Sequence, residues 1–99
     1  MRRKSLHVAL ILTVLVSMRA VAAHAAQSLA SEKECAGLLG VANKELDAAR
    51  AKGLAGSVYV SRAAGLLGEA KVQQQFGKYR GCVSKAKRAR VLIKRANIG

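Results

Sequence analysis

In the last quarter of the chain, mostly apolar residues recur at steps of three and four, so an α-helix would place them on one side. The members of this stripe are Tyr79, Cys82, Val83, Ala86, Arg90 and Ile93. Basic residues populate much of the remaining surface, and the stretch from Lys78 to Gly99 holds eight Lys or Arg and no Asp or Glu. Because these like charges repel one another, the helix needs support from elsewhere. An apolar face packed on other helices or a covalent link through Cys82 would provide it.

An earlier stripe follows a helix-capping pattern. Ser31 and Glu34 are three residues apart, so each side chain can satisfy a backbone N–H group left free at a helix start. The stripe that follows consists of Cys35, Leu38, Leu39, Ala42, Leu46 and Ala49. Gly53 is a suitable C-terminal stop. We therefore predict an amphipathic helix that begins at Ser31 and ends close to Gly53.

The segment between Gly53 and Gly77 has the same period, and Gly77 marks the second break, after which the third helix follows. Ser57 can cap a helix there, and its apolar stripe is Val60, Ala63, Ala64, Leu67 and Ala70. Val58 to Val60 could instead be a strand, but three residues without a partner segment cannot make a sheet. The predicted fold is therefore all-α, a small up-down-up three-helix bundle that follows an N-terminal signal helix.

The N-terminus has the organisation of an export signal. A basic start, residues 1–4, precedes an apolar run from Leu6 to Met18. That run is shorter than the roughly 20 residues of a membrane-spanning helix and fits the about 7 to 15 residues of a signal-peptide core. Ala23 and Ala25 then form a small-residue site, so we predict a signal peptide over residues 1–25 with cleavage before Ala26. Residues 20–22 are the alternative cleavage site, and an uncleaved anchor or a buried helix is the competing interpretation of the segment.

The predicted mature domain, residues 26–99, has a narrow chemistry. Cleavage removes four of the 18 basic residues and none of the five acidic ones, which leaves 14 against five and a net charge of +9. Both histidines are removed as well, and with them the usual general base and the commonest metal ligand. The remaining acids form no pair evidently poised for acid and base work, and the sequence has no Gly-rich phosphate loop. We therefore expect a protein without enzymatic activity, catalytic residues, metal site, cofactor or substrate-sized pocket.

The two cysteines, Cys35 and Cys82, each lie four residues into a predicted helix. In an up-down-up bundle the first and third helices are parallel, so both thiols should lie at one level. Paired cysteines are common in exported proteins, and a disulfide is the favoured interpretation. Free or intermolecular thiols and a catalytic thiol are the alternatives, although the C-x-x-C spacing of redox pairs is absent.

Small residues recur in a definite order along these helices. The positions are Leu67, Ala70, Gly77, Tyr79, Cys82, Ala86 and Ala89, with residues 48–53 as an earlier segment. Over residues 35–93 the chain thus resembles an alanine-rich exported helical domain of bacteria, a family of unknown function whose members often lie beside an outer-membrane anchoring module. The resemblance implies a helical hairpin or bundle in the envelope without known catalysis. The chain departs from that pattern at Cys82, where Ala is usual, and in its basic last helix, where acidic residues often occur.

Five basic residues of the last helix are candidates for binding anions: Lys85, Lys87, Arg88, Lys94 and Arg95. Clustered cations attract anionic envelope surfaces such as lipid head groups, lipopolysaccharide or an acidic protein. A solvated surface that only aids solubility is the competing interpretation. Nucleic acid would also suit the charge, but export argues against it.

The predicted function is that of an exported, non-enzymatic structural or interaction module of the bacterial envelope, located in the periplasm or secreted, with no transmembrane span after processing. The alternative is a dedicated binder of anionic envelope surfaces that acts through the C-terminal basic helix. The observations above leave the oligomeric state open.

Overall fold

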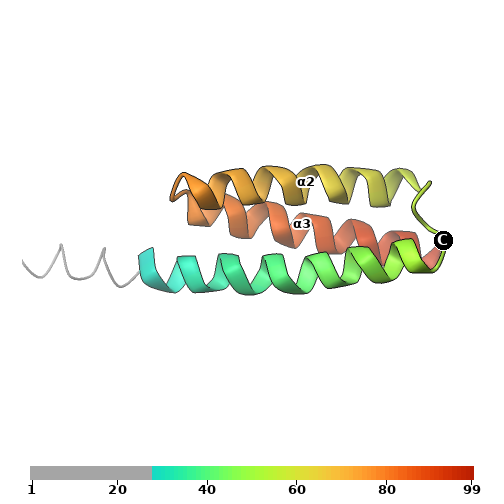
Figure 1. Cartoon of the computed structure of the whole chain (residues 1–99), viewed down its shortest axis with the longest axis horizontal. Coiled ribbons are helices and arrows are strands. Elements are labelled where there is room, and N and C mark those ends of the chain that lie inside the picture. The colour runs from blue at the N-terminus through green and yellow to red at the C-terminus, as the bar shows by residue number, and fades with distance from the viewer. Residues whose placement is uncertain (1–27) are drawn as a thin grey trace, which may run out of the picture.

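The computed structural model describes residues 28–99. The predicted signal peptide, residues 1–25, and the predicted cleavage-site residues Ala23, Ala25 and Ala26 lie outside the described residues. Three helices follow (Figure 1): the first helix over residues 28–51, α2 over Val58–Gln75 and α3 over Tyr79–Ile98. The prediction of an all-α three-helix bundle is confirmed.

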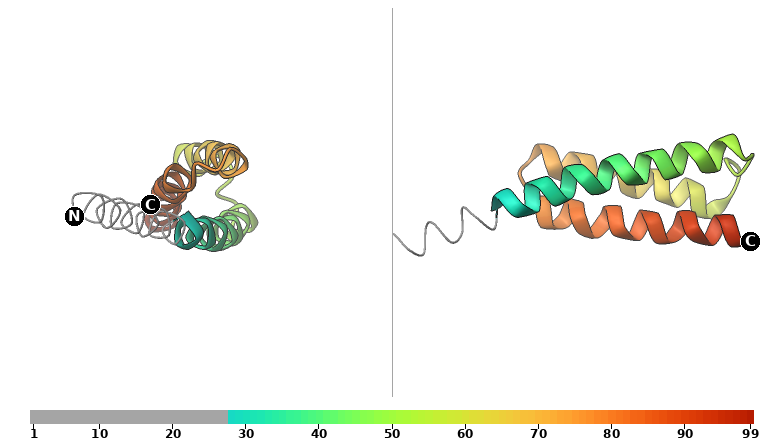
Figure 2. Two further views of the ribbon diagram at one scale, coloured as in Figure 1. Left: turned by 90° about the vertical axis from the view of Figure 1, so that its left-hand side faces the viewer. Right: turned by 90° about the horizontal axis from the view of Figure 1, so that it is seen from below.

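The helices alternate in direction. The first helix and α3 run the same way, α2 runs the opposite way, and the chain ends beside the connection from the first helix to α2 (Figure 1). Seen end on, the three helices occupy the corners of a triangle (Figure 2). This is the predicted up-down-up order, and it brings the starts of the first helix and α3 to the same end of the bundle.

The first helix does not begin where the capping pattern predicted. The chain is already helical at residue 28, so Ser31 lies inside the helix and the predicted start is wrong. The preceding Leu29 and Ala30 have good helix propensity, and neither is a Gly or Pro that would interrupt a helix. A Ser cap stabilises a helix by only about 1 kcal/mol. That is too little to fix the helix start at Ser31 when the residues before it also favour a helix.

Two glycines end the first helix and α2 in the same manner. Gly53 and Gly77 have φ angles of 86° and 73°, which an L side chain rarely adopts. After the first helix, the N–H groups of Gly53 and Leu54 donate to the carbonyl oxygens of Arg50 and Ala49, at 3.0 Å each. Gly77 and Lys78 repeat this pair of bonds at the end of α2, at 3.1 and 2.8 Å. Both are Schellman motifs, so the stops predicted at these glycines are confirmed.

The start of α2 also agrees with the sequence. The hydroxyl oxygen of Ser57 accepts a hydrogen bond from the backbone N–H of Tyr59 at 3.2 Å, and Val58 to Val60 are helical. Rejection of a strand at Val58 to Val60 was therefore correct. A short, well-capped connection holds α2 antiparallel to the first helix.

The core is built largely from small side chains. In the described part of the chain, seven of the 14 buried apolar residues are alanine. The core consists of Cys35, Leu39, Ala42, Leu46, Ala49, Val60, Ala63, Leu67, Ala70, Cys82, Ala86, Ala89, Ile93 and Ala96. Because burial stabilises by roughly 25 cal/mol per Å² of apolar area, alanines add little each. The bundle therefore depends strongly on its few larger side chains and on covalent support.

The buried face of α3 is rotated slightly from the predicted stripe. Ala89 and Ala96 are buried, although neither was assigned to it, while Tyr79 and Val83 are only partly buried. Arg90 was placed among the apolar positions, but its side chain retains 32% exposure at the edge of the core. The assignment of Arg90 to the apolar stripe is therefore wrong. Its long side chain extends to the carboxylate of Glu45 on the first helix, and smaller residues fill the core.

Candidate functional site

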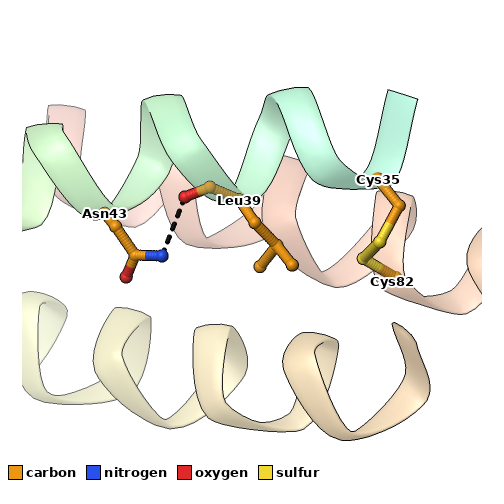
Figure 3. Close-up of a disulfide and its surroundings, with 4 residues drawn as sticks. All are labelled: Cys35, Leu39, Asn43 and Cys82. Atoms are coloured by element: carbon orange, nitrogen blue, oxygen red, sulfur yellow. Dashed lines mark hydrogen bonds between the residues drawn. A yellow bond between two sulfur atoms is a disulfide. The ribbon is translucent and has the colours of Figure 1, made fainter. Parts of the chain in front are cut away.

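A disulfide joins the starts of the two parallel helices. Cys35 and Cys82 are bonded, their Cα atoms lie 5.6 Å apart, and neither residue is exposed. Cys35, Leu39 and Asn43 follow one another at single-turn intervals on the first helix, with Cys82 facing Cys35 (Figure 3). The Asn43 amide donates to the Leu39 carbonyl oxygen at 2.8 Å. Both sulfur atoms are thus bonded within the core, which leaves the exposed charges as the candidate functional groups.

The five predicted anion-binding residues do not share one surface. Lys87 and Lys94 are seven residues apart, as are Arg88 and Arg95, so each pair occupies one flank of α3. Lys85 lies three residues before Arg88 and therefore on its flank. The structure thus divides this set between two sides of the helix.

Two of these five residues have acidic partners on other helices. Lys85 Nζ lies 3.0 Å from Glu69 Oε2 on α2, and Lys87 Nζ lies 3.4 Å from Glu34 Oε1 on the first helix. The sequence pattern predicted a capping role for Glu34. It does not reveal that Lys87 of α3 lies opposite Glu34 where the first helix and α3 pack together. These pairs reduce the positive charge that Lys85 and Lys87 present to a partner.

A third ion pair, between Arg90 and Glu45, was missed. Arg90 Nη2 donates to Glu45 Oε1 at 2.8 Å, and Arg90 Nε donates to the same oxygen at 3.1 Å. This hydrogen bonding, assisted by the carboxylate charge and opposed by a smaller effect of burial, raises the pKa of Arg90. The pair spans 45 residues of sequence, so no short-range spacing could have indicated it. It ties the first helix to α3 on the side opposite Arg88 and Arg95.

An open groove lies on the outer side of the α2 and α3 pair. Its volume is about 590 Å³, and it is lined by Arg62, Gly65, Leu66, Glu69, Arg88, Val91, Leu92 and Arg95. The expectation that the bundle has no hollow of substrate size is therefore wrong. Gly65 has no side chain to fill the space, and a Cβ built there would meet nothing within 4 Å. Half-buried Leu66 and Leu92 supply apolar surface in the groove.

The groove carries an excess of positive charge. Within residues 28–99, Arg62, Arg88 and Arg95 form no ion pair, and the lining carboxylate of Glu69 is paired with Lys85. Guanidinium groups present planar sets of donors that match phosphate and carboxylate oxygens. The arrangement can hold an anion that also has an apolar part. Sequence reasoning found Arg88 and Arg95 but missed Arg62, which belongs to a different helix.

Other chemistry is limited in the described part of the chain. Residues 28–99 contain no group of three His, Cys, Asp or Glu side chains that could hold a metal ion, and no helix there is long and apolar enough to cross a membrane. Comparisons with protein-family models, with curated proteins and with solved structures gave no match. The resemblance over residues 35–93 stays a prediction.

Proposed function

We propose that the protein is a non-enzymatic interaction module of the bacterial envelope that binds an anionic component through its basic surface. One observation carries this proposal: the distribution of ion pairs. Residues 28–99 hold 14 basic and five acidic side chains, and four of the acids, Glu34, Glu45, Asp47 and Glu69, are paired. Ten basic side chains have no acidic partner among these residues, so most of the positive charge faces solvent.

The predicted export supports an envelope partner. The basic start, the apolar run and the Ala-x-Ala site are those of a signal peptide, and a buried disulfide suits an oxidising compartment. The proposed location is the periplasm or the extracellular medium. Partners available there include anionic lipid head groups, lipopolysaccharide and acidic proteins, whereas nucleic acid is disfavoured.

Binding by such a surface is sensitive to salt. Exposed cations attract an anionic surface over a distance set by the Debye length, about 8 Å at physiological ionic strength. Several basic residues acting together therefore give an affinity that falls steeply as salt rises, while a disulfide-linked core is little affected. A surface that served solubility alone would show no such saturable binding.

The test is sedimentation of the protein, purified after export, with vesicles of neutral lipid, vesicles containing anionic phospholipid, and lipopolysaccharide aggregates, each over a range of salt concentration. We expect binding to at least one anionic preparation at low salt, loss of that binding at high salt, and little binding to neutral vesicles. Absence of binding to every anionic preparation at low salt would refute anion binding and leave the basic surface a solvated one.

A further inference from the structure

The groove is part of a larger face of the bundle. On α2, Val58, Arg62, Gly65 and Glu69 succeed one another at steps of four and three, and on α3 the same is true of Arg88, Val91, Arg95 and Ile98. Phe76, the residue that caps the C-terminus of α2, lies seven residues beyond Glu69 and so extends this row past the end of the helix. The shared groove lining places both rows on one side of the bundle. We call this side, defined by these nine residues, the outer face.

The outer face exposes large apolar side chains. Val58, Phe76, Val91 and Ile98 are 64%, 76%, 51% and 87% exposed. Because α2 and α3 are antiparallel (Figure 1), Val58 and Ile98 lie toward one end of the pair and Phe76 toward the other, with Val91 between. Apolar groups thus occur along the length of this face.

The cations on the same face are all arginines without acidic partners among residues 28–99. Arg62 comes from α2, and Arg88 and Arg95 come from α3, with the groove and its half-buried Leu66 and Leu92 between the two helices. Arginines beside exposed apolar side chains are typical of protein surfaces that bind at the membrane interface. There the apolar groups enter the boundary of the acyl chains, and the cations remain at the phosphates. A soluble polyanion would engage the arginines but would leave the apolar side chains in water.

We propose that the outer face is a docking surface for a bilayer containing anionic phospholipid. Arg62, Arg88 and Arg95 bind the head-group phosphates, while Val58, Phe76, Val91 and Ile98 enter the interface beside them. The proposal rests on the proposed function and deepens it, because it selects lipid among the anionic partners and names the surface that meets it. Charge complementarity and the exposed apolar row together favour lipid over lipopolysaccharide sugars or an acidic protein.

The first experiment compares two variants that lose the same charge. One carries Arg62→Gln, Arg88→Gln and Arg95→Gln; the control carries Lys33→Gln, Lys44→Gln and Lys52→Gln, three exposed and unpaired positions on or just after the first helix. At about 1 kcal/mol for each basic residue near the membrane surface, the arginine variant should lose roughly 100-fold in affinity for anionic vesicles. The control should lose only a few-fold, and circular dichroism should show both variants helical. Equal losses would overturn the outer face as the contact while leaving the proposed function standing.

A second experiment tests apolar insertion without changing the charge. Val91→Gln with Ile98→Gln should weaken vesicle binding at least tenfold and leave binding to heparin, a soluble polyanion, unchanged. Because the chain has no Trp, a single probe can also be introduced at Phe76, with a matched probe at exposed Val41 of the first helix. Anionic vesicles should shift the emission of the Phe76→Trp variant to shorter wavelength and leave that of Val41→Trp unchanged.

The outcomes separate the two proposals. Unchanged vesicle binding by the Val91 and Ile98 variant, or equal emission shifts for the two probes, would overturn membrane docking by this face. Binding of the wild type to lipopolysaccharide or heparin but not to phospholipid vesicles would overturn the lipid assignment and keep the proposed function. Failure to bind any anionic preparation would overturn both.

Discussion

α3 packs against the first helix on one side and against α2 on the other, and we call these two contacts its seams. They differ in how far acidic partners neutralise the basic residues of α3. Along the first helix, α3 is joined by the Cys35–Cys82 disulfide, and Arg90 and Lys87 are paired with Glu45 and Glu34. Along α2 the described ion pair is that of Lys85 with Glu69, and Arg88 and Arg95 line an open groove with Arg62. Among residues 28–99, two cations on one flank of α3 are thus paired, with Lys94 as an exception, whereas on the other flank only Lys85 is paired. The position of acids on neighbouring helices, rather than the charge of the helix itself, determines where unpaired positive charge remains on its surface.

The seams also differ in strength. Exposed ion pairs contribute little to stability, and Lys87 with Glu34 is such a pair, at 61% and 51% exposure. The disulfide contributes far more, because it restricts the unfolded chain. The seam with α2 has no covalent bond beyond the chain itself, so its stability rests on apolar packing. This contrast can be tested by changing each contact in turn.

Removal of the disulfide should have the largest effect. The bond joins residues 47 apart, and closure of such a loop stabilises by about 4 kcal/mol on the chain-entropy model. That is a large part of the 5–15 kcal/mol typical of a domain. Reduction, or the variant Cys35→Ala with Cys82→Ala, should lower the melting temperature by at least about 15 °C. Thermal unfolding followed by circular dichroism, with and without reductant, is the measurement, and a shift of only a few degrees would show that packing alone secures the first helix.

Truncation of a buried leucine should come next. Leu46 on the first helix and Leu67 on α2 are 4% and 5% exposed, and replacement of either by Ala should cost about 3 kcal/mol. With the disulfide intact, the two variants should lose similar unfolding free energy in denaturant titrations, because both residues belong to one core. A markedly smaller cost for Leu46→Ala would mean that the first helix is held by its disulfide more than by its packing.

Loss of the half-buried ion pair should have a smaller effect. Glu45→Gln removes the charge opposite Arg90, and it should lower the melting temperature more than Glu34→Gln, since Glu34 and Lys87 are more exposed. Because the pKa of Arg90 is raised in the folded state, its contribution is complete below the pKa of the unfolded chain and is lost only as pH rises through the raised value. The difference between Glu45→Gln and the wild type should therefore owe nothing to Arg90 titration at neutral pH. An equal lowering for the two variants would contradict this ranking, and melting temperatures equal to that of the wild type would show that neither pair adds measurable stability.

The smallest predicted effect is a gain. Gly68 lies inside α2, and a Cβ built there meets nothing within 4 Å. Gly68→Ala should stabilise the protein by about 0.5 to 1 kcal/mol, because glycine costs that amount relative to alanine within a helix. Gly53→Ala is the matched control, since its φ of 86° makes the same change unfavourable. Denaturant midpoints should therefore move in opposite directions, and movement in the same direction would contradict this account.

Features that depend on the local sequence, such as helical periodicity and helix ends, could be predicted. Features that depend on contacts between helices could not. Ser57, Gly53 and Gly77 act locally, so their effects on helix ends were predictable. The common level of Cys35 and Cys82 was predicted from the helix order together with their places near the predicted helix starts, although the first helix is already formed at residue 28. The pairing of Arg90 with Glu45 depends on how two helices rotate about their axes, which no short-range spacing reveals.

The candidate site shows the same limit. The predicted anion-binding residues, Lys85, Lys87, Arg88, Lys94 and Arg95, are close in sequence, but neighbouring residues of a helix point in different directions and so do not share one surface. The groove arises where Gly65 of α2 faces α3 and lies beside Arg62. At the other end of the seam, Gln73 rests against Gly81, where a Cβ would collide with its amide group. Contacts in which a glycine of one helix leaves space beside a neighbouring helix depend on how the helices pack, so the sequence alone does not reveal them.

The disulfide has a further consequence for the covalent topology. Cys35 and Cys82 close a ring that includes all of α2 and both connections, with exposed Lys52 in one connection and exposed Lys78 in the other. A single tryptic cut after either lysine would open the backbone yet leave the two fragments attached to each other. Such nicked protein should migrate as one species without reductant and as two with it. Only cuts in both connections would free α2, so the chain can be cleaved once in a connection and its three helices still remain covalently linked.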